Sequence, residues 1–305
     1  MHPRRAPRRL RPPALPARAG RDRVTFLAAG APGTPGSGAP TLIGVPYDAT
    51  ASFRRGSRWG PAAIRFASAS IETYNPLLDR DLEDVPFVDA GDLPVEGLEP
   101  SAMVRAVRGS IGPGLPLLLG GEHTLTLGAV QALAARHRDL AVLQWDAHTD
   151  LRSEYEGAAI CHATVMRRLF DERVSLVQLG IRAGTREEFA TARQRSLHVS
   201  RAVAPPPPLL ESLRERPLYL TVDIDVLDPS VAPGTGNPEP DGAAYADLLA
   251  ALRSLSRHRV VGMDLVEVAP PWDPGGATPV IAASLVRDML LLFAPAGRGP
   301  AASSP

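Results

Sequence analysis

The sequence predicts an α/β protein with three layers, α/β/α, around a central and mostly parallel sheet. From residue 41 onward, short apolar runs alternate with amphipathic stretches, and the connections between them are short. Polar side chains gather where several of these runs end, as is typical of the carboxyl edge of a parallel sheet. The chain has 305 residues, 44% of them hydrophobic, which is enough for one large core.

Seven apolar runs are predicted strands because each is short and is followed by turn-forming or charged residues. In chain order they are Thr41–Val45, Val85–Asp89, Leu115–Leu119, Ala141–Asp146, Ser175–Gly180, Leu218–Asp223 and Val260–Val268. Their lengths of five to nine residues fit buried strands better than helices.

Seven further stretches are predicted helices because their apolar residues recur at helical spacing. They are Pro61–Ser70, Ser101–Ser110, Leu127–Arg136, Ala163–Phe170, Arg186–Gln194, Tyr245–Leu255 and Pro279–Leu292. Right-handed crossovers between parallel strands then place the carboxyl end of every strand along one edge of the sheet. The run Pro205–Pro208 is predicted to be a stiff loop before the strand that starts at Leu218.

The chain is predicted to be one domain, residues 41–294, between two tails. Residues 1–40 are rich in Arg and Pro, contain eight Arg and one Asp, and lack an apolar run of signal-peptide length. We expect them to be disordered, although a targeting segment, a nucleic-acid-binding arm or an over-extended start would have the same composition. Residues 295–305 are predicted to be a frayed C-terminal tail.

The composition argues against nucleic-acid and membrane partners. The 33 basic residues are all Arg, which together with the abundant Ala, Pro and Gly indicates a GC-rich coding bias rather than a nucleic-acid surface. No window reaches about 18 consecutive apolar residues, so no membrane span is predicted. The single cysteine, Cys161, excludes an intrachain disulfide and fits a cytoplasmic location.

The stretch Asp146-Ala147-His148-Thr149-Asp150 directly follows the apolar run Ala141–Trp145. Successive side chains of an extended segment point to opposite faces, so positions 146, 148 and 150 would point the same way. Two carboxylates and an imidazole would then face one spot, which is what a metal site requires.

Two other predicted strands end in residues of the same kind. Gly120-Gly121-Glu122-His123 follows one strand, and Asp223-Ile224-Asp225 follows another. Taken alone, the first is most simply a tight loop and the second a turn or a helix cap. On one sheet edge, however, the three stretches together predict a metal centre with six ligands: His123, Asp146, His148, Asp150, Asp223 and Asp225.

Six protein ligands are more than one ion needs if a position stays open for water, so two ions are predicted. Carboxylates with some imidazole and no thiolate suit Mn²⁺ better than a structural zinc. We therefore expect two Mn²⁺ per chain. A water shared by two such ions is deprotonated near neutral pH, which would activate it for hydrolysis.

These three stretches resemble those of the ureohydrolases, the family of arginases and agmatinases, in the same order and over about Thr41 to Leu292. The third continues as Asp223-Ile224-Asp225-Val226-Leu227-Asp228-Pro229, as it does in that family. The resemblance implies an arginase-like fold, a dinuclear manganese enzyme that releases urea from a guanidino substrate, and a homo-oligomer, either a trimer or a hexamer. By position, His123, Asp146, Asp150 and Asp223 would hold one ion, and Asp146, His148, Asp223 and Asp225 the other.

The resemblance also assigns catalytic roles to three residues. Glu267 would bind the guanidinium group, and a carboxylate does offer the bidentate acceptor that a guanidinium needs. His162 would pass a proton to the departing amine, and Asp150 is counted as catalytic as well as a ligand. Alone, Glu267 could be a surface glutamate and His162 a loop histidine. A nucleophilic Cys161–His162 pair is disfavoured because adjacent side chains in an extended loop diverge.

Within the family, the loop Leu151–Gly157 looks more like that of agmatinases than that of arginases. It carries acids that suit a terminal amine, so Arg152 and Glu154, together with Asn237 and Glu267, are expected to contact the substrate. The segment Ser52–Pro61 is also agmatinase-like, although its Gly and Pro residues have a structural reading at the start of a helix.

The predicted reaction is the hydrolysis of agmatine to putrescine and urea. Alternatives are enzymes of the guanidinobutyrase, guanidinopropionase, arginase and formimidoylglutamase types. From other classes, a deacetylase with a single zinc ion and a non-catalytic regulatory homologue remain. Three departures from the family pattern leave the substrate open: Glu122 replaces Asp, Asn237 replaces Thr and Asp241 replaces Gly.

Overall fold

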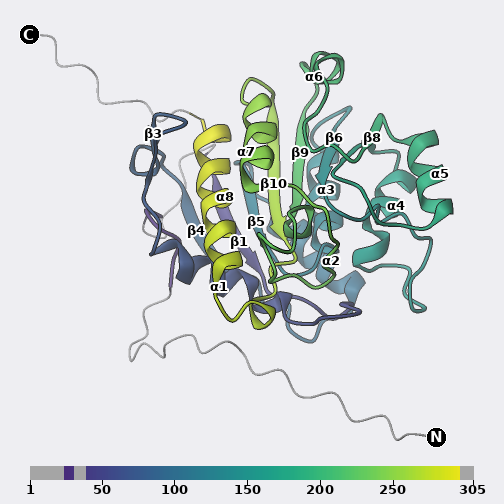
Figure 1. Cartoon of the computed structure of the whole chain (residues 1–305), viewed down its shortest axis with the longest axis horizontal. Coiled ribbons are helices and arrows are strands. Elements are labelled where there is room, and N and C mark those ends of the chain that lie inside the picture. Colours follow the sequence, from purple (N-terminus) through teal and green to yellow (C-terminus); the bar gives the residue numbers. More distant parts are fainter. Residues whose placement is uncertain (1–23, 31–38, 296–305) are drawn as a thin grey trace, which may run out of the picture.

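The computed structural model describes residues 24–30 and 39–295 (Figure 1). Its centre is an eight-stranded sheet in the order β4-β1-β5-β10-β9-β6-β7-β8, and every neighbouring pair in this sheet is parallel. The strands are β1 (Thr41–Val45), β4 (Val88–Asp92), β5 (Pro116–Gly120), β6 (Ala141–Trp145), β7 (Ser175–Leu179), β8 (His198–Ser200), β9 (Leu218–Asp223) and β10 (Val260–Val266). A separate antiparallel pair joins β2 (Tyr74–Asn75) to β3 (Arg80–Asp81).

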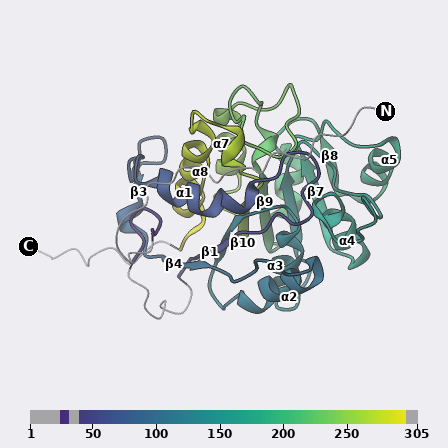
Figure 2. The same cartoon turned by 90° about the horizontal axis from the view of Figure 1, so that it is seen from below.

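Helices cover both faces of the sheet (Figure 2). Apolar side chains of α1 (Gly60–Ser68), α6 (Pro207–Leu213), α7 (Tyr245–Ser254) and α8 (Ala277–Phe293) join one buried cluster. Those of α2 (Pro100–Ser110), α3 (Leu125–Ala134), α4 (Val165–Asp171) and α5 (Arg186–Arg195) join the other. Strand residues alternate between the clusters, as in β6, where Leu143 faces the first and Val142 the second. The predicted α/β/α architecture is confirmed.

All seven predicted strands are present, but the second one begins later than predicted. Residues Leu82–Asp84 form a 3-10 turn in which the Asp81 side chain accepts a hydrogen bond from the backbone N–H of Glu83. The ladder with β1 therefore starts only where Val88 pairs with Thr41. The sequence also missed β8, which is only three residues long and lies at the sheet edge, so it carries little periodic signal.

The predicted stiff loop at Pro205–Pro208 was partly wrong. Pro207 begins α6, whose N-cap is Pro206. Proline suits the first turn of a helix because its fixed φ is already helical and its missing N–H is not needed there. Leu213 at the end of this helix is fully buried against the sheet.

Part of the predicted N-terminal tail packs on the domain. Phe26 is 1% exposed and meets Phe87 edge-on, and its backbone N–H donates to the Asp89 carboxylate at 2.9 Å. The expectation of disorder therefore fails for residues 24–30, because a phenylalanine inside the Arg- and Pro-rich stretch reaches the core. Residues 1–23, 31–38 and 296–305 lie outside the described part of the chain, and for them disorder stays a prediction.

Asp89 is held in turn by Arg65 of α1, and both side chains are buried. The guanidinium donates to both Asp89 oxygens, at 2.8 and 2.9 Å, and to Asp92 at 2.5 Å. Burial alone would raise the pKa of Asp89, but the hydrogen bonds and charge of Arg65 outweigh burial and lower it. This ion pair ties the first helix to β4 and to the N-terminal segment.

The four strands at the middle of the sheet, β5, β10, β9 and β6, are direct neighbours and end at similar heights. Leu119 pairs with Leu265, Val266 with Asp223, and Val222 with Trp145. The residues that follow these strands therefore meet at one place on the carboxyl edge. In the part of the chain that is described, no helix is long and apolar enough to cross a membrane.

We expect Asp89→Asn to lower the free energy of unfolding by about 3–5 kcal/mol, because it leaves the buried Arg65 charge without its main partner. Urea unfolding at pH 7 measures the loss. Asp92→Asn is the matched control. It removes the second carboxylate on the same guanidinium, but Asp92 has a side chain 42% exposed, so the expected loss is below about 1 kcal/mol.

The stability that Asp89 contributes depends on pH with a fixed sign, because the pKa of Asp89 is lowered in the folded state. Its contribution is complete above the unfolded value of about 3.9 and is lost as the pH falls through the folded value. The stability gap between wild type and Asp89→Asn should thus stay constant from pH 7 to about 5 and narrow in more acid solution. A gap that widened on acidification would contradict the assigned pairing.

Candidate metal centre and substrate cavity

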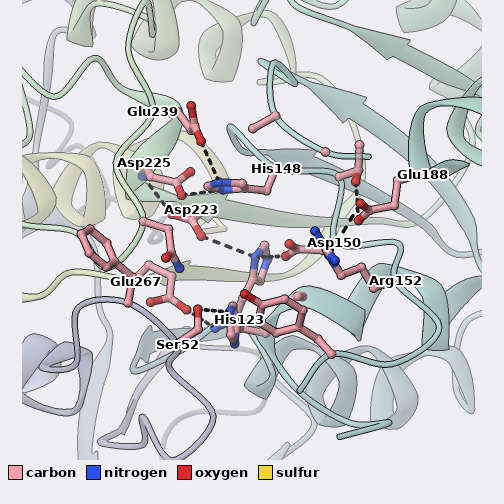
Figure 3. Close-up of a pocket in the computed structure, with 18 of the residues that line it drawn as sticks. Ser52, His123, His148, Asp150, Arg152, Glu188, Asp223, Asp225, Glu239 and Glu267 are labelled. Carbon is pink, nitrogen blue, oxygen red and sulfur yellow. Dashed lines mark hydrogen bonds and ion pairs between the residues drawn. The ribbon is translucent and has the colours of Figure 1, made fainter. Parts of the chain in front are cut away.

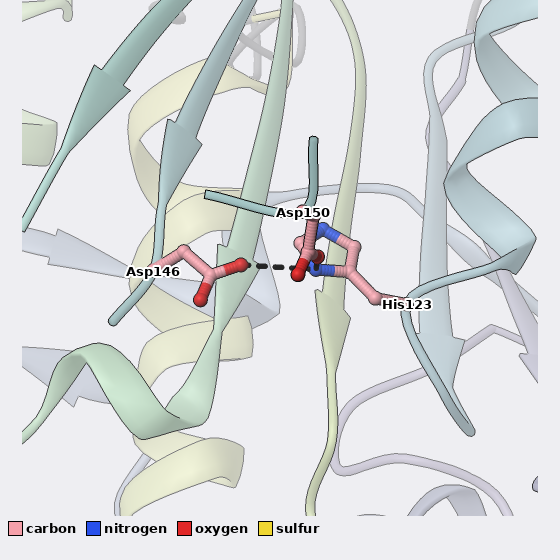
Figure 4. A group of neighbouring side chains, drawn as sticks. All are labelled: His123, Asp146 and Asp150. Atoms are coloured by element: carbon pink, nitrogen blue, oxygen red, sulfur yellow. Dashed lines mark ion pairs between the residues drawn. The ribbon is translucent and has the colours of Figure 1, made fainter. Parts of the chain in front are cut away.

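His123, which follows β5, lies between two carboxylates that follow β6 (Figure 4). Its Nδ1 is 3.1 Å from Asp146 Oδ2, 3.1 Å from Asp150 Oδ2 and 3.6 Å from Asp223 Oδ2. His123 and Asp146 are almost fully buried, and Asp150 is 7% exposed. His123, Asp146 and Asp150 thus form a first group of potential metal ligands.

A second group lies beside the first and shares one residue with it. His148 Nδ1 is 2.9 Å from Asp225 Oδ2 and 3.6 Å from Asp146 Oδ1. Asp146 therefore turns one carboxylate oxygen toward each histidine. Among the described residues, these two groups are the ones whose ligand atoms lie close enough together to hold an ion. Five of the six residues that the sequence predicted as ligands belong to these groups, and the sixth, Asp223, lies beside them, 3.6 Å from His123 Nδ1.

The contacts of His123 test whether this site fits a cation. Its Nε2 is 2.8 Å from the Thr221 hydroxyl, whereas its buried Nδ1 has no hydrogen-bond partner among the described residues. A nitrogen that faces three carboxylates without hydrogen-bonding geometry is oriented as a metal ligand would be. The other ring nitrogen is fixed by an outer partner, as is usual for metal-bound histidines. The donor set of imidazoles and carboxylates fits manganese.

Burial and close neighbours make the charges of this cluster unfavourable, as the shifted pKa values of its members indicate. Burial opposes a charge on His148, but Asp225 and Asp146 outweigh burial and raise its pKa to about 12. Burial and Asp146 raise the pKa of Asp150 to about 7, and burial with Asp225 raises that of Asp223 well above its ordinary range. Protons are thus held among the carboxylates, and divalent cations would take over their role.

The backbone holds two site residues in left-handed conformations, Asp150 at φ 54° and Glu267 at φ 64°. Such conformations cost on the order of 1 kcal/mol or more for residues with side chains, and they cluster at functional sites. The Glu267 N–H donates to Gly121 O at 2.9 Å. A Cβ at Gly121 would lie 2.4 Å from Val45 O, so the loop before His123 requires glycine.

A cavity of about 480 Å³ opens beside the two groups (Figure 3). It is lined by Ser52, Phe53, His123, His148, Thr149, Asp150, Arg152, Tyr155, His162, Ala163, Ala183, Gly184, Thr185, Glu188, Asp223, Asp225, Asn237, Pro238, Glu239 and Glu267. Five of the six predicted ligands reach its wall, and Asp146 lies behind them. The cavity therefore gives a small molecule access to the carboxylates.

The predicted catalytic residues Glu267 and His162 both line the cavity. Glu267 Oε1 accepts a hydrogen bond of 2.9 Å from the backbone N–H of His123, and burial and the charge of Glu122 raise its pKa well above the usual range. Burial, with smaller contributions from His148 and His123, lowers the pKa of His162 to about 4, so its ring is neutral at pH 7. The neighbouring Cys161 is buried, and burial raises the pKa of its thiol, which does not suit a nucleophile.

Of the other predicted substrate contacts, two lie at the cavity and one does not. Asn237 lines it, and so does Arg152, whose guanidinium sits 4.8 Å over the Tyr155 ring and whose Nε lies 3.7 Å from Glu188. Glu154 is exposed and is not part of the lining, so its expected contact is not supported. Within this loop Arg152 and Tyr155 line the cavity, whereas Ser153 and Glu154 are exposed.

Two acids that the sequence reasoning missed also line the cavity, Glu188 and Glu239. Glu188 caps α5, where it accepts from the Thr185 N–H at 2.7 Å, and it also accepts from the Thr149 hydroxyl at 3.0 Å. The Thr-x-x-Glu spacing signals the cap but not the cavity. Glu239 lies 3.7 Å from His148 Nε2, on the loop where Asn237 departs from the family pattern.

The imidazole and carboxylate groups at the carboxyl edge of this α/β/α fold define a metal-binding site in which two ligand groups share Asp146. The chain belongs to the Arginase family, whose family model matches residues 39–292. It is a ureohydrolase that acts on linear amidines.

The chain is similar to proteins with several named substrates. It is 40% identical to an agmatinase of Bacillus subtilis, over 83% of this chain and 91% of that one. It is 35% identical to a guanidinobutyrase of Pseudomonas aeruginosa, over 83% of this chain and 85% of the relative. The solved structure of proclavaminate amidino hydrolase from Streptomyces clavuligerus superimposes with a TM-score of 0.80 at 30% identity, covering 89% of this chain and 97% of that structure.

We expect manganese to stabilise the chelator-treated protein, because the bound cations offset the repulsion among the buried carboxylates. At free Mn²⁺ one hundredfold above its dissociation constant, the gain is about 2.7 kcal/mol for each independent site. Asp146→Asn should lose most of this gain and most of the bound metal, since both groups share Asp146. Thermal unfolding and metal analysis measure the two effects.

Asp92→Asn is the control, because it removes a carboxylate outside both groups. This variant should bind as much manganese as the wild type. If Asp146→Asn bound manganese as the wild type does, the shared position of Asp146 would have no role in metal binding.

Proposed function

We propose that this ureohydrolase converts agmatine and water to putrescine and urea, with two Mn²⁺ per chain. His123, Asp146, Asp150 and Asp223 would hold one ion, and Asp146, His148, Asp223 and Asp225 the other. When bound, the two ions supply a water that is activated near neutral pH. The proposal rests on the cavity next to the two ligand groups and on the charges that line it.

The charge of the cavity wall is the observation that carries the choice of substrate. Two divalent cations would balance the four aspartates, and Glu267 would pair with the guanidinium. Glu188, Glu239 and Arg152 then remain, so the part of the cavity available to the substrate's tail has one more acid than base. A tail that ends in an ammonium group fits this wall better than one that ends in a carboxylate.

Glu267 is proposed to bind and orient the guanidinium. Its carboxylate offers two acceptor oxygens, and the His123 N–H fixes one of them at 2.9 Å. A bidentate pair of this kind restricts both the position and the tilt of the planar guanidinium. The raised pKa of Glu267 indicates a buried carboxylate that gains from a cationic partner.

His162 is proposed to hand a proton to the departing amine. Its neutral ring lines the same cavity, and Ser52 and Tyr155 hold it in place. The Ser52 hydroxyl is 3.4 Å from His162 Nε2, and the Tyr155 ring meets the imidazole edge-on at 5.8 Å. An imidazole so placed can accept the proton that the attacking water gives up and donate it to the departing amine.

A guanidino acid such as 4-guanidinobutyrate is the second candidate. Arg152 favours it, because its guanidinium lines the cavity and could bind a carboxylate if it left Glu188, which lies 3.7 Å away. The similarity to a guanidinobutyrase points the same way. Assembly into a trimer or hexamer and a cytoplasmic location stay predictions from the sequence.

We expect the manganese-loaded protein to release urea from agmatine with a kcat/KM at least about tenfold above those for arginine, 4-guanidinobutyrate and 3-guanidinopropionate, a margin of about 1.4 kcal/mol. A colorimetric urea assay across the four compounds measures this. Glu267→Gln, which keeps the size of the side chain but not its charge, should retain manganese and lose the activity.

The variant Glu239→Gln tests whether Glu239 acts on the substrate's tail or on the reaction itself. Loss of this charge should lower kcat/KM for agmatine and not for 4-guanidinobutyrate. Equal losses for both compounds would mean that Glu239 acts on His148 instead, from 3.7 Å. Urea release from 4-guanidinobutyrate but not from agmatine would overturn the proposed substrate and leave the chemistry in place.

A further inference from the structure

Glu122, one of the departures from the family pattern, has no hydrogen bond to the neighbouring His123 side chain among those that the structure describes. Its fully buried carboxylate accepts three hydrogen bonds from two threonines. The backbone N–H of Thr50 donates to Oε2 at 2.8 Å, and the hydroxyls of Thr50 and Thr124 each donate to Oε1 at 2.6 Å. Both threonine hydroxyls thus donate to this carboxylate.

Thr50 connects this carboxylate to His162. A threonine hydroxyl has one hydrogen, and here it is given to Glu122, so the remaining lone pairs of Thr50 Oγ1 can only accept. Two His162 nitrogens face them, the backbone N–H at 3.3 Å and ring Nδ1 at 3.4 Å. Nδ1 can satisfy an acceptor only when it carries a hydrogen.

The other ring nitrogen of His162 is then the one with a free lone pair. Nε2 lies 3.4 Å from the hydroxyl of Ser52, which lines the cavity together with His162. Proton exchange with a molecule in the cavity would therefore take place at Nε2. A histidine with the opposite tautomer would present an N–H there and could not accept a proton.

We propose that Glu122, acting through Thr50, fixes His162 as the Nδ1–H tautomer and so leaves Nε2 free to exchange protons with the substrate. Glu122 and Thr50 are positioning residues, and the proposal rests on the proposed role of His162. It also gives the departure at position 122 a reason, because the carboxylate of an aspartate, one methylene shorter, would lie further from Thr50.

The variant Glu122→Gln should reverse the tautomer. The Thr50 N–H needs an acceptor and so holds the amide oxygen, which turns the amide NH₂ toward the Thr50 hydroxyl oxygen. That oxygen then accepts from Gln, and its hydrogen is released to donate to His162 Nδ1. This relay of hydrogen bonds, from Glu122 through Thr50 to His162, would thus run in the opposite direction, with the hydrogen of the ring on Nε2.

The tautomer is measured on the full chain, free of metal and labelled with ¹⁵N-histidine, from long-range ¹H–¹⁵N spectra at pH 7. His162→Asn identifies the signals of His162 among those of the seven histidines. We expect Nδ1–H in the wild type and Nε2–H in Glu122→Gln. An Nε2–H ring in the wild type, or an unchanged Nδ1–H ring in the variant, would overturn the proposal.

Kinetics of the manganese-loaded enzyme provide the second measurement. In Glu122→Gln we expect kcat for agmatine to fall about tenfold to a hundredfold, within the range of general acid–base catalysis, with KM within about twofold and metal content unchanged. Thr50→Val should show the same loss, and Thr50→Ser, which restores the hydroxyl, should recover it. Equal rates for Thr50→Val and Thr50→Ser would contradict the relay even if Glu122→Gln failed to fold.

Tyr245→Phe is the matched control, because it also removes a hydroxyl that donates to a buried carboxylate, that of Asp288 at 2.7 Å, but outside the cavity lining. Its kcat should equal that of the wild type. Failure of the relay can be distinguished from failure of the proposed function. If agmatine gave no urea while the tautomer reversed in Glu122→Gln, the relay would stand and the assigned substrate would fall.

Discussion

The structure depends on one electrostatic constraint: four aspartates and His123 are buried together, beside the half-buried His148, where β5, β10, β9 and β6 end. Like charges in a poorly solvated place repel strongly, so the cluster is tolerable only with positive charge inside it. Protonated imidazoles and shared protons provide some of this charge, as the raised pKa of His148 indicates. Divalent cations would provide more, and Asp146, with one oxygen toward each histidine, lies where two of them would share a ligand. Metal affinity and the stability of this edge are therefore two aspects of the same interaction.

The parallel sheet makes this concentration of charge possible. Right-handed crossovers bring every strand end to one edge, and the four central strands are neighbours that end at similar heights. Two core clusters, one on each face, pack against the strands. Contacts far from the cavity also stabilise the sheet, such as the Arg65–Asp89 pair that joins α1, β4 and the segment at Phe26. Left-handed backbone at Asp150 and Glu267 is the local strain that this packed sheet can hold.

Much of the fold and the candidate metal ligands could be predicted from the sequence because they follow local patterns. The order of an apolar strand and then Asp146, His148 and Asp150 predicts a metal site, and the topology joins this stretch to His123 and Asp225. The extended backbone expected for the stretch does not reach Asp150, which is left-handed at φ 54°. The part of the cavity that is available to the substrate's tail could not be predicted in this way. Glu188 signals only a helix cap, Glu239 lies in a loop without periodicity, and Glu154 is an acid of the expected kind that faces outward. The contact between Glu122 and Thr50 spans 72 positions, so no local pattern reveals it. Residues 24–30 were misjudged because one phenylalanine outweighs the composition around it.

The central claim, that two cations share Asp146 in this cluster, is tested most directly by anomalous scattering from crystals of the manganese-loaded chain. The account predicts two anomalous peaks at the carboxyl edge, one beside His123 and one beside His148, with a different oxygen of Asp146 bound to each ion. A single peak, or two peaks with Asp146 bound to neither or to only one of the ions, would contradict it.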